Sequence, residues 1–290
     1  MHSILFTGAC TALVTPFLGD QINYPMLQRL LERQMEAGIR SIVICGTTGE
    51  SPTLSDAEKI NLYRSAKAFV GDQCQIIAGT GSNCTSHAIH LSQAAQDVGA
   101  DGVLIVSPYY NKCTSEGLVA HYAAIAASVQ IPVIAYNVPS RTGVDIPVEV
   151  YQALDMIPNM AGVKEASTDI SKIARIRAAC PDFPIWSGND DQAVAVMSLG
   201  GSGVISVLSN VLPVQTQAMA KAALDGDFDT AAALQLEMLP LIQALFSEVN
   251  PIPVKAAMKL IGYDCGECRL PLTPVSNPTL EKLKSLLLPC

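Results

Sequence analysis

The chain has 290 residues, 49% of them hydrophobic and 15% charged, which excludes a disordered or highly charged binding chain. Its formal net charge of −8 argues against a nucleic-acid partner, because such a partner requires a basic surface. No apolar stretch is long enough to span a membrane, and residues 1–10 lack the features of a secretory signal. We therefore expect a cytoplasmic protein whose nine cysteines are free thiols.

Eight short apolar segments are predicted to be β-strands. Their uninterrupted hydrophobic character is typical of parallel strands that are buried on both faces. In chain order they cover residues 9–14, 41–45, 75–78, 103–106, 133–135, 162–164, 185–186 and 204–207.

Helical patterns separate the predicted strands. Asn23 is a candidate cap for the first helix, and residues 55–58 (Ser-Asp-Ala-Glu) form a predicted capping box for the second. Apolar residues recur at helical spacing in two of these segments, at Leu27, Leu30, Leu31 and Met35 and at Ala88, Leu91, Ala95 and Val98. A glycine directly after several such stretches is typical of a left-handed helix cap.

The alternation of strand and helix indicates an α/β fold. Eight such units in about 210 residues favour a (β/α)8 TIM barrel, which we assign to residues 1–224. An open, doubly wound parallel sheet is the alternative. Helical patterns dominate after residue 212, so we assign residues 225–290 to a C-terminal helical region.

Lys164 is the first candidate for chemistry, because it ends an apolar strand and barrel active sites lie at the C-terminal ends of strands. Burial disfavours a charged ammonium group, and a neutral amine is a nucleophile toward carbonyl compounds. The alternative is a structural lysine paired with a carboxylate such as Glu165 or Glu50.

Two further residues follow the fifth predicted strand. Tyr136 has a phenol that can relay protons beside Lys164, although a tyrosine taken alone is more often a packing residue here. Arg141 has a guanidinium group that can hold a carboxylate through two hydrogen bonds, unless it is a plain surface arginine.

The segment Gly-Thr-Thr-Gly-Glu-Ser at residues 46–51 combines glycines with two hydroxyl groups that can hold a small anion. It is not a phosphate-binding P-loop, because the lysine of that motif is missing. We expect no metal site. His87 and His90 lack a carboxylate partner in their own segment, and Cys265 and Cys268 lack a second ligand pair.

Five segments together resemble the dihydrodipicolinate synthase family, within the superfamily of N-acetylneuraminate lyase and class I pyruvate aldolases. They occur in the family's order and cover nearly the whole chain. These segments are residues 46–51 (GTTGES), 107–112 (SPYYNK), 136–143 (YNVPSRTG), 162–166 (GVKEA) and 250–255 (NPIPVK).

The resemblance implies a lyase that condenses pyruvate with L-aspartate 4-semialdehyde in the diaminopimelate route of lysine biosynthesis. It implies no cofactor and a homotetramer built as a dimer of dimers. Lys164 would form the Schiff base, and Thr47, Tyr136 and Tyr110 would relay protons, with Tyr110 reaching in from a neighbouring subunit. The implied substrate-binding residues are Thr48 for the pyruvate carboxylate, Arg141 for the carboxylate of the second substrate, and Gly188 and Ile205 as lining.

Members of the family that are inhibited by lysine bind it in a cleft at a dimer interface. The matching positions in this chain are Ser51, Pro52, Asp56, Lys59, Asn83, His87 and Tyr109. The chain departs from the sensitive pattern, with Asp56 and Lys59 in place of histidines and His87 in place of an acid. Loss of that acid and the added charge of Lys59 predict weak or absent feedback by lysine.

Two rival functions remain. N-acetylneuraminate lyase and 2-keto-3-deoxy-sugar aldolases share the barrel, the lysine and the tyrosine, but Arg141 and the pair Tyr109 and Tyr110 favour the synthase. A catalytically silent barrel with a binding role is disfavoured by the intact set of proposed reactive residues.

Overall fold

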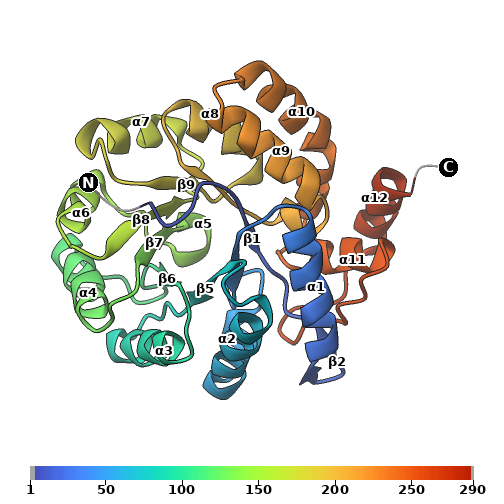
Figure 1. Cartoon of the computed structure of the whole chain (residues 1–290), viewed down its shortest axis with the longest axis horizontal. Coiled ribbons are helices and arrows are strands. Elements are labelled where there is room, and N and C mark those ends of the chain that lie inside the picture. Colours follow the sequence, from blue (N-terminus) through green and yellow to red (C-terminus); the bar gives the residue numbers. More distant parts are fainter. Residues whose placement is uncertain (1–3, 289–290) are drawn as a thin grey trace.

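The computed structural model describes residues 4–288, and its centre is a closed barrel of eight parallel strands (Figure 1). Around the barrel the strands run in the order β1-β10-β9-β8-β7-β6-β5-β4. Closure of the barrel confirms the predicted TIM barrel and excludes the open sheet. The barrel strands are β1 (Gly8–Ala12), β4 (Ser41–Ile44), β5 (Gln75–Gly79), β6 (Gly102–Val106), β7 (Val133–Asn137), β8 (Met160–Glu165), β9 (Ile185–Ser187) and β10 (Gly203–Ser206).

The first strand closes the barrel because it pairs on both sides. Its Gly8 is the register partner of Gly203 in β10, and its Thr11 is the partner of Ile42 in β4. Strand β1 is shorter than predicted, since the Val14 amide donates to the side chain of Asn210 (3.1 Å). A separate antiparallel pair, β2 (Phe17–Leu18) and β3 (Gln21–Ile22), follows it.

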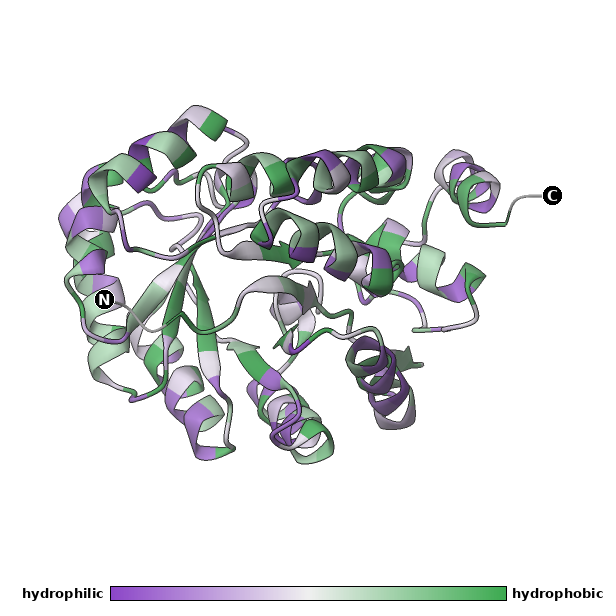
Figure 2. Ribbon diagram, turned by 45° about the horizontal axis from the view of Figure 1, so that its top comes forward, coloured by the Kyte–Doolittle hydropathy of each residue, from purple (hydrophilic) through white to green (hydrophobic). Residues whose placement is uncertain are grey.

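Helices cover the outside of the barrel, and each of them carries both apolar and polar residues along its length (Figure 2). Both predicted caps are confirmed, because Asn23 accepts from the Met26 amide and Ser55 with Glu58 forms a reciprocal capping box. These helices are α1 (Tyr24–Glu36), α2 (Asp56–Val70), α3 (Thr85–Asp97), α4 (Ser115–Ala127), α6 (Val148–Asp155), α7 (Ile170–Ala179), α8 (Ala193–Ser198) and α9 (Pro213–Leu224).

Short helical turns lie between some strands and the helices that follow them. The four-residue helix α5 (Pro139–Thr142) follows β7. Three 3-10 turns follow β4, β9 and β10, namely η1 (Ser51–Thr53), η2 (Asp190–Gln192) and η3 (Leu208–Asn210). Since these segments leave the C-terminal ends of strands, they form the face where barrel active sites lie.

Two apolar clusters fill the fold. One lies between the strands and the outer helices, and the other lies inside the barrel. Within the inner cluster, Phe6 stacks on Trp186 with ring centroids 4.8 Å apart, and the Trp186 indole donates to the Phe6 carbonyl (3.2 Å). The barrel interior is therefore a packed core.

The chain after α9 is helical, as predicted. The proposed boundary after residue 224 lies at the end of α9, and α10 (Phe228–Leu245) packs directly against α8 and α9. Helices α11 (Ile252–Leu260) and α12 (Asn277–Leu287) contact each other at the edge of the molecule (Figure 1). Within residues 4–288, no helix is long and apolar enough to cross a membrane.

Candidate active site

Lys164 and Tyr136 lie side by side inside the barrel. Their Cα atoms are register partners on β8 and β7, and the Lys164 Nζ lies 4.4 Å from the centroid of the Tyr136 ring. Both are buried, with 5% and 6% of their surfaces exposed. Glu50 and Glu165, the alternative partners of Lys164, instead lie 2.9 Å from Lys255 and 3.8 Å from Lys172. Neither carboxylate therefore neutralises Lys164.

Gly188 leaves room for the Lys164 side chain. A Cβ at this position would lie 3.1 Å from Lys164 Cε and 2.7 Å from the Ala166 Cβ. Ile205 belongs to the same inner cluster as Tyr136. Gly188 therefore lies beside Lys164, and Ile205 lies in the apolar cluster that also contains Tyr136.

Asp190 was missed by the sequence analysis. Only 3% of it is exposed, and its Oδ2 accepts hydrogen bonds from the amides of Val207 (2.9 Å) and Leu208 (3.0 Å). Burial raises the pKa of this carboxyl group, while its hydrogen bonds and the charge of Lys164 act in the opposite direction. Asp190 therefore holds the backbone after β10. In the sequence, only its neighbours in the η2 turn could have indicated this role.

The segment 46–51 follows β4 in a strained backbone. Cys45 and Glu50 both adopt a φ of 56°, in the left-handed region that non-glycine residues rarely occupy. A Cβ on Gly79 would lie 2.3 Å from the Cys45 carbonyl oxygen, so the segment can approach β5 only because residue 79 is glycine. The close packing positions Thr47 and Thr48 at the barrel mouth.

The C-terminal region holds this segment in place. Asn250 Nδ2 donates to the Thr48 hydroxyl oxygen (3.0 Å), so the Thr48 hydrogen is free to be donated to a ligand. Glu50 accepts from Lys255 Nζ (2.9 Å) and from the backbone amide of Arg269 (2.9 Å). Asn250 and Lys255 lie in the motif at residues 250–255, but nothing local in the sequence indicated their partners Thr48 and Glu50.

Tyr110 and Arg141 do not join the buried pair within one chain. The Tyr110 residue is 92% exposed and has a φ of 70°. Arg141 lies exposed on α5, and no carboxylate within residues 4–288 forms an ion pair with it. Both side chains are therefore available to a ligand or to another subunit.

The proposed lysine-binding cleft is partly assembled in the single chain. His87 Nε2 on α3 lies 2.9 Å from a carboxylate oxygen of Asp56 on α2, and Asn83 Nδ2 donates to the Tyr109 carbonyl (3.3 Å). The carboxylate partner absent from the segment of His87 thus comes from a neighbouring helix. Lys59 is buried on the same helix as Asp56, and Ser51 and Pro52 lie in the η1 turn.

Residues 4–288 contain no group of three metal-ligating side chains.

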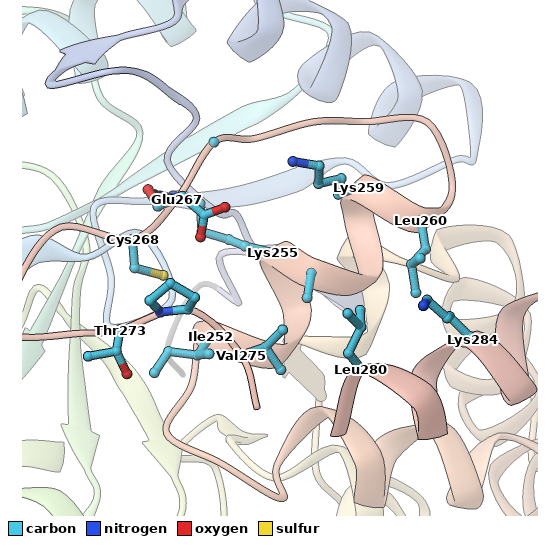
Figure 3. Close-up of a pocket in the computed structure, with 13 residues that line it drawn as sticks. Ile252, Lys255, Lys259, Leu260, Glu267, Cys268, Thr273, Val275, Leu280 and Lys284 are labelled. Atoms are coloured by element: carbon cyan, nitrogen blue, oxygen red, sulfur yellow. Dashed lines mark hydrogen bonds between the residues drawn. The ribbon is translucent and has the colours of Figure 1, made fainter. Parts of the chain in front are cut away.

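A cavity of about 360 Å³ lies between α11, α12 and the loop that joins them (Figure 3). Its three lysines already have carboxylate partners, since Lys255 pairs with Glu50, Lys259 with Asp264 (3.2 Å) and Lys284 with Glu281 (2.7 Å). With these three lysines paired, the cavity offers no unpaired lysine to an anionic ligand.

Comparison with known proteins places the chain among close relatives. The sequence model of the Dihydrodipicolinate synthetase family matches residues 5–288. The 4-hydroxy-tetrahydrodipicolinate synthase of Kosmotoga olearia is 48% identical over 290 residues, covering 99% of each chain. That of Caldicellulosiruptor saccharolyticus is 47% identical, covering 98% of this chain and 97% of the relative. The solved structure of the synthase from Methylacidiphilum fumariolicum has a TM-score of 0.95 at 44% identity, covering 97% of this chain and 95% of that one.

Proposed function

Because this chain belongs to the dihydrodipicolinate synthetase family, we propose that Lys164 is the residue that forms the family's Schiff base with pyruvate. The membership confirms the predicted resemblance. The chain is a lyase that condenses pyruvate with L-aspartate 4-semialdehyde in the diaminopimelate route to lysine. The observation that carries the residue assignment is the buried Lys164 amine beside the Tyr136 ring, while Glu50 and Glu165 pair with other lysines.

The reaction proceeds through covalent intermediates on Lys164. Its Nζ attacks the keto carbon of pyruvate, and loss of the carbonyl oxygen as water leaves a protonated imine. The imine draws electrons from the methyl group, which loses a proton to give an enamine. The enamine carbon attacks the aldehyde carbon of the second substrate, whose oxygen takes up a proton. The amino group of that substrate then displaces Lys164 and closes the ring.

Each of these steps moves a proton, so a relay beside the lysine is required. Tyr136 is the member in direct contact with Lys164, and Thr47 lies on the neighbouring segment at the mouth. Tyr110 completes the relay from a neighbouring subunit. Its exposure and left-handed backbone support this role, because the phenol projects away from its own barrel core.

The carboxylates of the two substrates bind to different groups. The Thr48 hydroxyl donates to the pyruvate carboxylate, since Asn250 already occupies its oxygen. Arg141 binds the carboxylate of the semialdehyde, because its guanidinium has no ion-pair partner within residues 4–288. Gly188 and Ile205 line the site beside Lys164 and Tyr136.

We further propose a cytoplasmic homotetramer built as a dimer of dimers. Sharing of Tyr110 between subunits requires at least a dimer with two-fold symmetry. The cysteines of residues 4–288 are free, as is usual in a reducing compartment.

Borohydride trapping tests the assignment of Lys164. The protein is incubated with pyruvate, reduced and digested, and its lysine peptides are weighed by mass spectrometry. We expect the mass of a reduced pyruvyl group on the Lys164 peptide. Lys172 and Lys255 serve as internal controls, because both are buried but paired with carboxylates. An unmodified Lys164 under turnover conditions would contradict the mechanism.

The choice of second substrate is tested by activity. Aspartate semialdehyde added before the borohydride should consume the imine and lower the amount of trapped adduct, whereas sialic acid should not be cleaved. Efficient cleavage of sialic acid would favour N-acetylneuraminate lyase, and the absence of any trapped imine would favour a silent barrel.

We propose that lysine inhibits this enzyme weakly or not at all. Asp56, an acid in the cleft that could hold a lysine ammonium, is already paired with His87, and Lys59 adds a like charge nearby. A lysine titration of the activity checks this proposal. Half-inhibition well below about 1 mM, the scale of weak binding, would contradict it.

A further inference from the structure

A buried polar network lies directly behind the reactive pair. Asn137 and Glu165 follow Tyr136 and Lys164 on β7 and β8, and they too are register partners. Side chains alternate along a strand, so Asn137 and Glu165 face outward to the helices while Tyr136 and Lys164 face the barrel interior. The predicted strands ended short of both residues, because neither is apolar.

Glu165 accepts hydrogen bonds from three directions. Asn137 Nδ2 donates to its carboxylate oxygens at 2.9 and 3.1 Å, the Tyr151 hydroxyl donates at 2.7 Å, and the Ser167 amide donates at 2.8 Å. Lys172 Nζ lies 3.8 Å away and balances the charge. A carboxylate with so many donors has a single favoured position, which also restrains the peptide that joins it to Lys164.

The orientation of the Asn137 amide is determined by a backbone donor. Its Oδ1 accepts from the Ile146 amide (3.0 Å), so the Nδ2 hydrogens must point to the carboxylates of Glu165 and Asp145, the latter at 2.8 Å. Asp145 also bonds to Lys172. Since residues 145 and 146 follow α5, the network reaches the segment that carries Arg141.

Tyr151 on α6 can only act as a donor here. Burial, and then the charge of Glu165, raise its pKa well above the usual value, so the hydroxyl keeps its proton. The network of Asn137, Asp145, Tyr151, Glu165 and Lys172 therefore joins β7, β8, α6, α7 and the segment after α5.

We propose that Asn137 and Glu165 are positioning residues that hold Tyr136, Lys164 and the Arg141 segment in their reactive arrangement. The inference rests on the proposed function, since it assumes that Lys164 forms the imine. Proton transfer between fixed groups is sensitive to small displacements, and a shift of about 1 Å can cost about 100-fold in rate. The affinity for pyruvate should change less than the rate of proton transfer, because Thr48 lies in the segment after β4 and outside the network.

Glu165→Gln tests the inference, because it preserves shape but replaces one acceptor by a donor. The fraction of sites trapped by pyruvate and borohydride is measured first, and kcat is then expressed per trapped site. We expect full trapping at saturating pyruvate, a kcat per trapped site lowered about tenfold or more, and a KM for pyruvate within about threefold.

Asp101→Asn is the matched control. Asp101 also joins a lysine and a backbone amide, bonding to Lys67 (3.0 Å) and to the Ile76 amide (2.8 Å), but it precedes β6 at the opposite end of the barrel. The Asp101→Asn substitution should lower the melting temperature and leave kcat per trapped site unchanged.

The outcomes separate the two proposals. Absence of trapping in the unchanged protein would overturn the proposed function. Normal trapping with an unchanged kcat per trapped site in Glu165→Gln would overturn the positioning role alone. If that variant does not fold, Tyr151→Phe decides by the same measurements, because it removes one hydrogen bond to Glu165 and keeps the ring. A kcat per trapped site lowered about threefold or more would support the inference, and an unchanged value would overturn it.

Discussion

Three lysines buried around the barrel mouth differ in what faces their amines. Lys255 contacts the Glu50 carboxylate, and Lys172 contacts Asp145 and Glu165. All three amines also lie over an aromatic ring, 4.4 to 5.7 Å from its centroid, so the carboxylate bonds are the difference between them. A carboxylate partner holds a lysine in the charged form, which has no lone pair to attack a carbonyl group. The absence of such a bond to Lys164 from Glu50 or Glu165 is therefore what distinguishes it chemically.

The phenol of Tyr136 should matter to catalysis far more than to stability. Tyr136→Phe keeps the buried ring beside Lys164 but removes the group that moves protons. We expect kcat to fall by about 100-fold or more, the usual scale for a lost acid–base group. Steady-state kinetics with a thermal melt checks this. Near-normal turnover would remove Tyr136 from the relay.

The Thr48 hydroxyl should contribute to pyruvate affinity. Thr48→Val keeps the shape and removes a donor to a carboxylate, a bond worth about 1.5–3 kcal/mol, so KM for pyruvate should rise by about tenfold or more. Thr216→Val is the control, because its hydroxyl is also buried and bonds to the Leu212 carbonyl (2.7 Å) in α9. Equal KM values in the two variants would argue against the role of Thr48.

Among the elements, α11 and the loop after it act as a support for the segment after β4. The pair of Lys255 and Glu50 is almost completely inaccessible, with 3% and 0% of the side chains exposed. Helix α11 and the loop after it therefore support the proposed site, although they contribute no reacting atom.

Breaking this ion pair should destabilise the protein strongly. Lys255→Met leaves the Glu50 charge buried without its cation, at a cost of about 3–5 kcal/mol in the free energy of unfolding. Adding Glu50→Gln should recover a large part of that loss, because the uncompensated charge is removed. Chemical denaturation of the single and double variants measures both effects, and a double variant no more stable than the single one would contradict the explanation.

A second contact, between Arg269 and Glu58, should appear as a pH dependence. The Arg269 hydrogen bonds, assisted by Ser55, lower the Glu58 pKa to about 2 from a usual 4.5. A carboxyl group whose pKa is lower in the folded state stabilises the fold above its unfolded pKa. That stability is lost as the pH falls from about 4.5 toward 2.

Glu58→Gln isolates this effect, because glutamine can still form the capping box of α2. We expect the melting temperature of the unchanged protein to exceed that of the variant near pH 6, with the gap closing as the pH falls below about 4.5. A gap that stays constant with pH would show that the charge of Glu58 does not matter.

At the scale of the whole molecule, our proposal requires a second subunit to supply Tyr110 to the site. Inactive Tyr110→Phe and Tyr136→Phe proteins can be dissociated, mixed in equal amounts and reassembled. In a mixed pair, one of the two sites has an intact Tyr136 and receives an intact Tyr110 from its neighbour. Random pairing should therefore restore about one quarter of the normal activity. No recovery in verified mixed pairs would place Tyr110 outside the neighbour's site.

The fold was largely predictable from local patterns. Apolar runs located the eight barrel strands, and Ser55 with Glu58 located the start of α2. The predicted strand ends were less accurate where polar residues continue a strand, as at Asn137 and Glu165. The burial of these two side chains depends on partners elsewhere in the chain.

By itself, the sequence determined the strand–helix alternation, the barrel and the motifs that identify the family, since each depends on neighbouring residues or short spacings. Only the tertiary structure decided which polar groups meet. Asn250 reaches Thr48 across 202 positions, and Lys255 reaches Glu50 across 205. His87 acquires Asp56 from another helix. Such pairs leave no local pattern, because barrel closure and the packing of the C-terminal helices bring distant side chains into hydrogen-bonding distance.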